Sequence, residues 1–155
     1  GCDATLHPVE TAYARTIEMA ASSGPDSPTG PPRPVVLLVD DDLLVRQTLT
    51  RYLQMSGFDV LAADNPDDAF VILGHSKVDA AILDVRLSAE RSGLEVLQFM
   101  RLDEHRRELP VIVLTGSQLT LVEEEVLKTH RAYLLSKPHG YSEVVQRLRN
   151  LLHQA

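Results

Sequence analysis

Short apolar runs alternate along the chain with segments of helical periodicity. The apolar runs cover residues 35–39, 58–62, 79–83, 110–114 and 132–135. Runs that are apolar at consecutive positions are typical of strands buried on both faces, as in a parallel sheet. Helices are expected between and after them, at about residues 43–56, 66–74, 93–103, 119–130 and 142–153. This order predicts an α/β fold, a doubly wound (βα)5 parallel sheet whose right-handed crossovers place helices on both faces.

Individual residues refine the expected helix ends. Gly57 is expected to end the first helix, since glycine readily adopts the left-handed conformation that follows a helix. Asn65 is a plausible N-cap of the second helix, and Pro66 suits its first position. The buried stripe of the first helix is expected to comprise Leu44, Val45, Thr48, Leu49, Tyr52 and Leu53.

The N-terminal part of the chain has a different composition. Residues 5–22 show helical spacing, and residues 22–34 consist mainly of proline, glycine and serine. Such a stretch buries too little apolar surface to offset its ordering entropy. We therefore expect an N-terminal extension at 1–34 and the folded domain at 35–155. The segment 5–22 has two interpretations, a remnant of a neighbouring region or an oligomerisation helix.

Composition narrows the class of protein. The 155 residues are 44% hydrophobic and carry a formal net charge of -7 without any basic run, which argues against direct binding of nucleic acid. The lone Cys2 leaves no intramolecular disulfide. With no apolar stretch long enough for a membrane span and no signal peptide pattern, we expect a cytoplasmic protein without direct membrane contact.

Polar residues follow the expected strands at their carboxyl ends. The first strand runs into Asp40-Asp41-Asp42, the third into Asp84, the fourth into Thr115, and the fifth leads through Ser136 to Lys137. Because parallel strands point the same way, these groups should gather at one edge, where open α/β sheets bind ligands. Clustered carboxylates repel one another unless a cation is near, and Mg²⁺ prefers such oxygen ligands.

Asp84 beside a bound metal is suited to nucleophilic attack on phosphorus. An aspartyl phosphate is a known type of covalent intermediate, and a metal with a positioned lysine neutralises the charge of the transferring group. Lys137 can supply that ammonium, aimed by the backbone that Pro138 restricts, and Thr115 offers a hydroxyl to a phosphate oxygen.

These motifs together resemble the receiver domain of two-component response regulators. The resemblance rests on the acidic pair after the first strand, Ile82-Leu83-Asp84, Val113-Leu114-Thr115-Gly116 and Ser136-Lys137-Pro138, and it extends from about Val35 to the end. It implies a flavodoxin-like sheet with strand order 2-1-3-4-5. It also implies reversible phosphorylation of Asp84 by a sensor histidine kinase or a histidine phosphotransfer domain.

The same resemblance implies roles for the surrounding residues. Asp40 and Asp41 are the acidic pair; Asp41 and Asp84 give carboxylates, and Arg86 its backbone carbonyl, to Mg²⁺ or Mn²⁺. Thr115 supplies the switch hydroxyl, and Lys137 is the amine that binds the phosphoryl group. Gly116 is the small residue that leaves access to the site.

The chain departs from the family pattern in places. The loop at 86–93 has no proline and one extra residue, Leu134 stands where the family commonly has an aromatic switch residue, and His139 replaces a common phenylalanine. A Pro-rich linker before the domain and an opening without Met favour the C-terminal receiver of a hybrid histidine kinase over a single-domain regulator. A homodimer is a further assembly that this interpretation allows.

Two other functions fit parts of the pattern. A pseudo-receiver would keep the fold for protein binding only, and the changed loop after Asp84 is compatible with it. A phosphatase of the haloacid dehalogenase type would use Asp40 and Asp42, which have that family's spacing, but Asp84 would then have no role.

Overall fold

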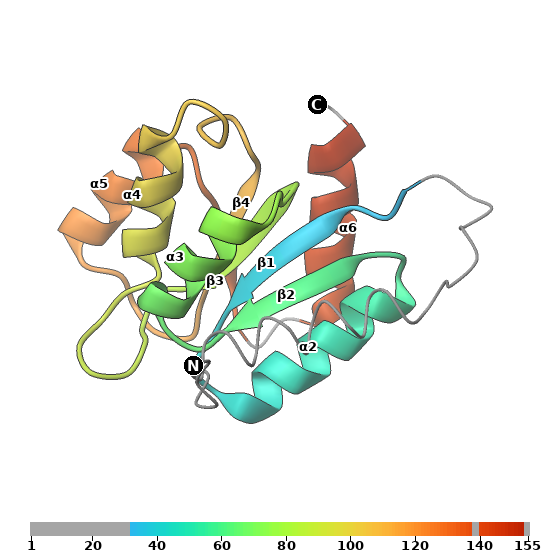
Figure 1. Ribbon diagram of the computed structural model, residues 1–155. Coiled ribbons are helices and arrows are strands. Elements are labelled where there is room, and N and C mark those ends of the chain that lie inside the picture. Colours follow the sequence, from blue (N-terminus) through green and yellow to red (C-terminus); the bar gives the residue numbers. More distant parts are fainter. Residues whose placement is uncertain (1–31, 138–139, 154–155) are drawn as a thin grey trace, which may run out of the picture.

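The computed structural model describes residues 32–137 and 140–153, and it confirms the predicted α/β architecture (Figure 1). Five parallel strands form one sheet in the order β2-β1-β3-β4-β5, the order expected for a flavodoxin-like fold. The strands are β1 (Val35–Val39), β2 (Asp59–Ala63), β3 (Ala80–Asp84), β4 (Val111–Thr115) and β5 (Tyr133–Ser136). The last four begin and end one residue later than predicted, so Asp84 and Thr115 are the final residues of their strands.

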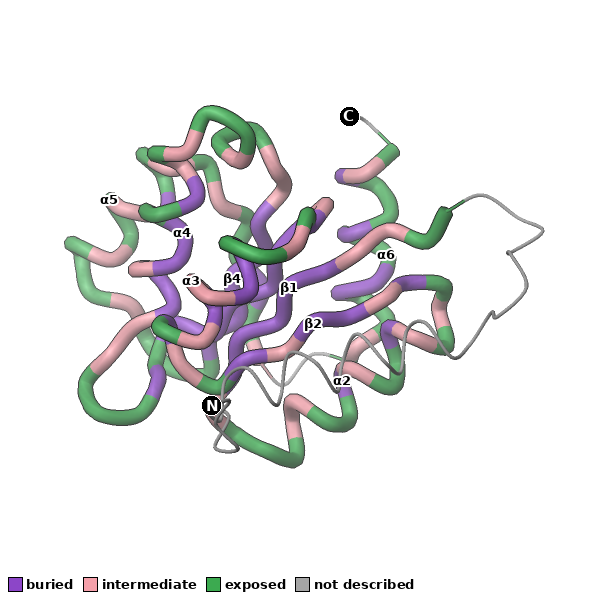
Figure 2. Tube along the Cα trace, viewed as in Figure 1, coloured by how far each residue is buried: buried purple, intermediate pink, exposed green. Residues whose placement is uncertain are grey.

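Helices cover both faces of the sheet, and they are α2 (Leu43–Met55), α3 (Pro66–His75), α4 (Leu94–Leu102), α5 (Leu121–Thr129) and α6 (Tyr141–His153). Alternate strand residues point to opposite faces. Leu37 and Val39 of β1 therefore pack in one core with α3, α4 and α5, while Val36 and Leu38 pack in another with α2 and α6. The buried segments in Figure 2 accordingly concentrate on the central strands.

The local signals at the helix ends are confirmed. Asn65 caps α3, since its side chain accepts the Asp68 N–H at 2.9 Å, and Pro66 begins that helix. Gly57, with φ +102°, follows the end of α2. Because L-residues rarely adopt such a φ, glycine is the natural residue for this reversal into β2.

The predicted buried stripe of α2 is partly wrong. Leu49 and Leu53 are buried, but Leu44 is 72% exposed, and Thr48 and Tyr52 are exposed as well. The residues that face the sheet follow an i, i+4 spacing through Val45, Leu49 and Leu53. Leu44 stands five positions before Leu49, which places it about 140° away around the helix axis.

A residue that precedes β1 also contacts the domain. The Arg33 guanidinium donates to the Asp59 carboxylate at 3.0 Å and to the backbone carbonyls of Gln54 and Phe58. The helix predicted at 5–22 and nearly all of the Pro-rich linker lie outside the described residues, as do Pro138 and His139. Within the described part of the chain, no helix is both long and apolar enough to cross a membrane.

Candidate metal and phosphoryl site

Strand register brings the predicted site residues to one edge of the sheet. Val39 pairs with Leu83, so Asp40 after β1 lies beside Asp84 at the end of β3. Thr115 pairs with Ser136, and the backbone N–H of Lys137 donates to the Thr115 carbonyl at 2.7 Å. The gathering of these groups at the carboxyl edge is therefore confirmed.

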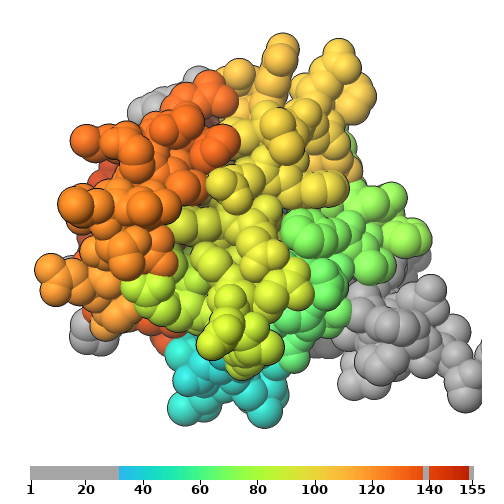
Figure 3. Space-filling model, turned by 90° about the vertical axis from the view of Figure 1, so that its left-hand side faces the viewer, coloured from blue at the N-terminus to red at the C-terminus, as the bar shows by residue number. Residues whose placement is uncertain are grey.

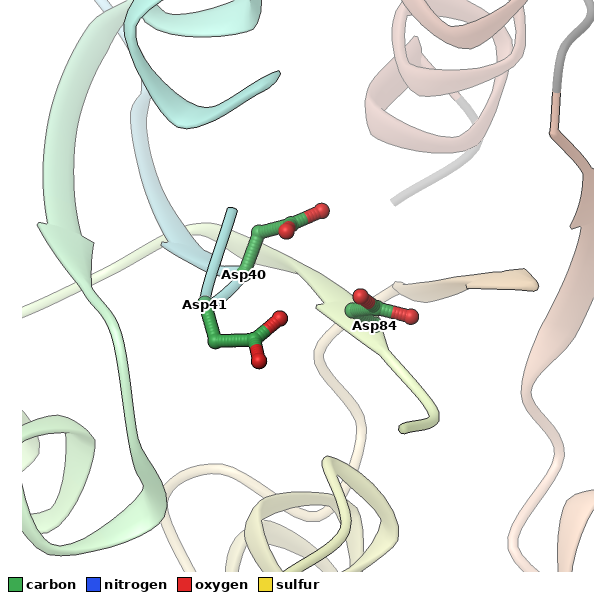
Figure 4. A group of neighbouring side chains, drawn as sticks. All are labelled: Asp40, Asp41 and Asp84. Carbon is green, nitrogen blue, oxygen red and sulfur yellow. The ribbon is translucent and has the colours of Figure 1, made fainter. Parts of the chain in front are cut away.

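Three carboxylates face a common space at this edge (Figure 4). Asp40, Asp41 and Asp84 each present an oxygen, and these atoms lie within 4.8 Å of one another. Asp40 and Asp84 are only 1% and 7% exposed, and Asp41 is the most exposed of the three. Converging carboxylate oxygens are the donors that hard divalent cations prefer, so the residues fit an Mg²⁺ ion.

Lys137 connects two of these acids. Its Nζ donates to Asp40 Oδ2 at 2.9 Å and to Asp84 Oδ2 at 3.1 Å. Burial acts to lower the pKa of Lys137, but the hydrogen bonds to both carboxylates outweigh it, and the net pKa is raised. The lysine is thus held as an ammonium between the carboxyl groups of Asp40 and Asp84.

The environment of Asp84 disfavours its ionised form. Burial, followed by repulsion from Asp40, raises the pKa of the Asp84 carboxyl above its usual 3.8, against the opposing effects of Lys137 and the Arg86 backbone N–H. A carboxyl that binds its proton more tightly when folded stabilises the fold below the unfolded-state pKa. That stability is lost as pH rises through the folded-state pKa.

Asp84→Asn is therefore expected to raise the melting temperature in EDTA at about pH 7, by roughly 2–6 °C, because the buried charge is removed. The gain in melting temperature should shrink as pH falls through the folded-state pKa and be smallest below the usual pKa of 3.8, where the wild-type carboxyl is protonated in both states. Thermal unfolding of both proteins across this range measures the difference. A gain that does not change with pH would contradict the assigned direction of the pKa shift.

Asp42 has a structural role instead. Its side chain accepts the Val45 N–H at 3.1 Å and caps α2, while its backbone N–H donates to Asp40 Oδ1 at 2.9 Å. The pair needed for a haloacid dehalogenase site, Asp40 with Asp42, is therefore not the pair that faces the common space. Asp84, which that alternative leaves without a role, is at its centre.

Thr115 is buried at the predicted edge, but its hydroxyl is engaged locally. The hydroxyl donates to the Ser117 carbonyl at 2.8 Å and accepts the Ser117 N–H at 3.2 Å. Gly116 lies between them, and a Cβ there would stand 3.7 Å from the Lys137 side chain. The hydroxyl thus needs a small rearrangement before it can donate to a group on Asp84.

The altered loop after Asp84 forms a tight turn that sequence reasoning missed. Ala89 and Glu90 have φ values of 59° and 58°, and the Arg91 N–H donates to the Ser88 carbonyl at 3.2 Å. Positive φ at both central residues is typical of a type I′ turn. Neither residue is glycine or asparagine, so the sequence carried no signal for it. The turn places the Ser88 hydroxyl 2.7 Å from Asp41 Oδ2.

A known protein family and several curated proteins resemble this chain in sequence. A family model described as response regulator receiver domain matches residues 36–149. The chain is 29% identical over 119 residues to the phosphate regulon transcriptional regulatory protein PhoB of Pseudomonas aeruginosa, covering 77% of this chain and 52% of that protein. It is 32% identical to the response regulator MprA of a Mycobacterium species, over 77% of this chain and 50% of MprA. The chain spans about half the length of these curated relatives.

Solved structures show the same fold. The chemotaxis protein CheY4 of Vibrio cholerae superposes with a TM-score of 0.70 at 24% identity, over 77% of this chain and 99% of CheY4. The response regulator TrrA of Thermotoga maritima, solved in complex with Mg²⁺ and BeF, gives a TM-score of 0.66 at 24% identity, over 76% of this chain and 98% of TrrA.

Proposed function

The chain belongs to the response regulator receiver domain family, and on that basis we propose that Asp84 accepts a phosphoryl group from the phosphohistidine of a partner protein. The observation that supports this most is the convergence of Asp40, Asp84 and Lys137, with Lys137 Nζ 2.9 and 3.1 Å from the two carboxylates. An acid next to a positioned ammonium and a second, buried acid is an arrangement suited to nucleophilic attack on phosphorus.

In the proposed reaction an ionised oxygen of Asp84 forms the new bond to phosphorus. The bond between phosphorus and the partner's imidazole nitrogen breaks, and its electron pair stays on that nitrogen. Lys137, whose ammonium lies 3.1 Å from Asp84 Oδ2, is placed to neutralise charge on the phosphoryl oxygens as they approach. The Thr115 hydroxyl can donate to one of these oxygens once it leaves the Ser117 carbonyl.

We assign the metal ligands to Asp41 and Asp84, with Asp40 in hydrogen-bonding support and the Arg86 carbonyl as a further oxygen donor. A bound Mg²⁺ supplies positive charge that favours the ionised form of Asp84 and the approach of a phosphoryl group. The Ser88 hydroxyl donates to Asp41 Oδ2 at 2.7 Å and so helps to orient that carboxylate. Figure 4 shows the Asp41 carboxylate facing the common space.

The partner in this proposal is a histidine kinase or a histidine phosphotransfer domain, and the setting is the cytoplasm. Phosphorylation then changes the protein-binding surface near α5 and β5. A homodimer and a position within a hybrid histidine kinase are compatible with this role. The protein-binding alternative without phosphorylation is less favoured, because Asp84, Thr115 and Lys137 are all present at the site.

The proposal is tested by incubating the 155-residue chain with acetyl phosphate in Mg²⁺ or in EDTA and measuring its intact mass. We expect one added phosphoryl group in Mg²⁺ and at least a roughly hundredfold lower rate of addition in EDTA, because the metal offsets several kcal/mol of charge repulsion. Equal labelling in both would contradict the metal's role. No adduct, with Mg²⁺ binding shown separately, would instead favour the protein-binding module.

A further inference from the structure

The side chain of Arg86 joins two loops at the phosphoryl site. Arg86 follows Asp84 by two residues in the β3–α4 loop, and its guanidinium crosses to the β4–α5 loop and the first turn of α5. Nε donates to Ser117 Oγ at 3.2 Å, and Nη2 donates to the Gln118 carbonyl at 3.0 Å and to Glu123 Oε1 at 2.9 Å. Nη1 pairs with the other Glu123 oxygen. In Figure 3 the yellow-green surface of this loop meets the orange surface of α5.

The contacts with Glu123 make a two-pronged ion pair. Two parallel N–H···O bonds fix both the distance and the orientation of the groups. Hydrogen bonding to Arg86 lowers the pKa of Glu123, and the same bond raises the pKa of Arg86. Glu123 is also tied to its own helix, because Oε1 accepts the Thr120 N–H at 2.8 Å and the Thr120 hydroxyl accepts the Glu123 N–H at 3.1 Å.

This network reaches the Thr115 hydroxyl. Ser117 accepts the Arg86 hydrogen bond with its side chain, while its backbone carbonyl and N–H bind Thr115 Oγ1 at 2.8 and 3.2 Å. The proton that Thr115 would donate to a phosphoryl oxygen is therefore committed to Ser117. The Arg86 guanidinium in turn binds Ser117, Gln118 and Glu123, and so it fixes the loop segment that holds the Thr115 hydroxyl.

We propose that Arg86 is a positioning residue whose ion pair with Glu123 holds the β4–α5 loop in the arrangement that turns Thr115 toward Ser117, and thereby opposes loading of Asp84. This inference rests on the proposed function. A group on Asp84 that recruits the Thr115 hydroxyl must draw the loop away from the Arg86 contacts. Binding then includes the free energy of breaking these contacts, so the apparent affinity equals the intrinsic affinity multiplied by the fraction of molecules in which the loop is released.

The test titrates the protein with beryllium fluoride, a mimic of the phosphoryl group, in excess Mg²⁺ and follows binding by NMR of the backbone amides. The measured quantity is the beryllium fluoride concentration at half-saturation. Arg86→Ala and Glu123→Gln are each expected to lower this concentration by roughly two- to fivefold, the range for an exposed ion pair. Glutamine retains the capping interaction with Thr120, so Glu123→Gln removes the charge pair and leaves the helix cap. Glu124→Gln, at an exposed acid in the same turn, is the matched control and should match wild type.

The double variant and a conservative variant sharpen the result. Arg86→Ala combined with Glu123→Gln should bind no more tightly than the better single variant, since both remove the same contact. Arg86→Lys, which keeps the charge but not the fork, should lie between wild type and Arg86→Ala. Weaker binding by Arg86→Ala would show that the guanidinium contacts the bound group, and would overturn the proposal.

Hydrogen exchange in the free protein gives a second readout. Arg86→Ala and Glu123→Gln should raise amide exchange in residues 116–120 relative to wild type and to Glu124→Gln, because the loop is no longer held. Unchanged exchange overturns the inference alone. Failure of every protein, wild type included, to bind beryllium fluoride contradicts the proposed function instead.

Discussion

Replacing Asp84 with asparagine is expected to abolish phosphoryl transfer from a small phosphodonor, with a loss of at least roughly a thousandfold, as is typical when a nucleophile is removed. The amide is nearly isosteric with the carboxylate and still offers an oxygen to Lys137, which donates to Asp84 Oδ2 at 3.1 Å. The loss therefore reports the missing nucleophile and not a collapsed site. Intact mass after incubation with acetyl phosphate and Mg²⁺ measures it.

Asp42→Asn is the control for this experiment. Asp42 belongs to the same acidic run, but it caps α2 through the Val45 N–H at 3.1 Å, and asparagine caps a helix as well as aspartate does. Labelling should therefore stay near the wild-type level. A protein that loses labelling with Asp42→Asn and keeps it with Asp84→Asn would contradict the assignment of the acceptor and favour the haloacid dehalogenase pattern.

Gly93→Ala is expected to destabilise the fold strongly, by roughly 2–4 kcal/mol, because the added methyl group enters occupied space. A Cβ at this position would lie 2.1 Å from the Asp84 carbonyl oxygen and 3.2 Å from Leu83 Cβ. The backbone at Gly93 has ordinary helical angles, with φ -62°, so the requirement for glycine is steric and not conformational. Relief of the contact must move β3 or the start of α4, and either shift disturbs Asp84.

Gly74→Ala is a matched substitution that is expected to change the free energy of unfolding in the opposite direction. Gly74 lies within α3, and a Cβ there would meet nothing within 4 Å. Alanine in a helix is favoured over glycine by roughly 0.5–1 kcal/mol, so this variant should be more stable than wild type. Urea unfolding of the three proteins compares them. A Gly93→Ala protein as stable as wild type would contradict the close approach of Gly93, at the start of α4, to the Asp84 backbone.

Sequence was informative where local chemistry determines structure. Strands buried on both faces must be apolar at consecutive positions, so the five runs and their order along the chain predicted the parallel sheet. Because all strands point the same way, Asp40, Asp84 and Lys137 could be brought to one edge without knowledge of any side-chain contact. Asn65 and Pro66 marked the start of α3 for equally local reasons.

The contacts of the altered loop could not be predicted in this way. Arg86 reaches Glu123 across 37 positions. The turn at Ala89 and Glu90 is formed by residue types that are unusual for positive φ. The sequence suggested only a backbone role for Arg86. The direction of the Thr115 hydroxyl likewise depends on the path of the loop around Ser117. The exposure of Leu44 depends on how α2 is rotated about its axis against the sheet.

The central claim is that Asp84 carries the phosphoryl group, and chemical trapping tests it most directly. Borohydride reduces an aspartyl phosphate to homoserine: a first hydride adds to the acyl carbon and phosphate leaves, and a second hydride and a proton convert the resulting aldehyde to the alcohol. Peptide mass spectrometry then locates the changed residue. After acetyl phosphate and Mg²⁺, we predict homoserine at position 84 and unchanged aspartate at positions 40, 41 and 42. Homoserine at one of those three positions, with Asp84 unchanged, would contradict the account.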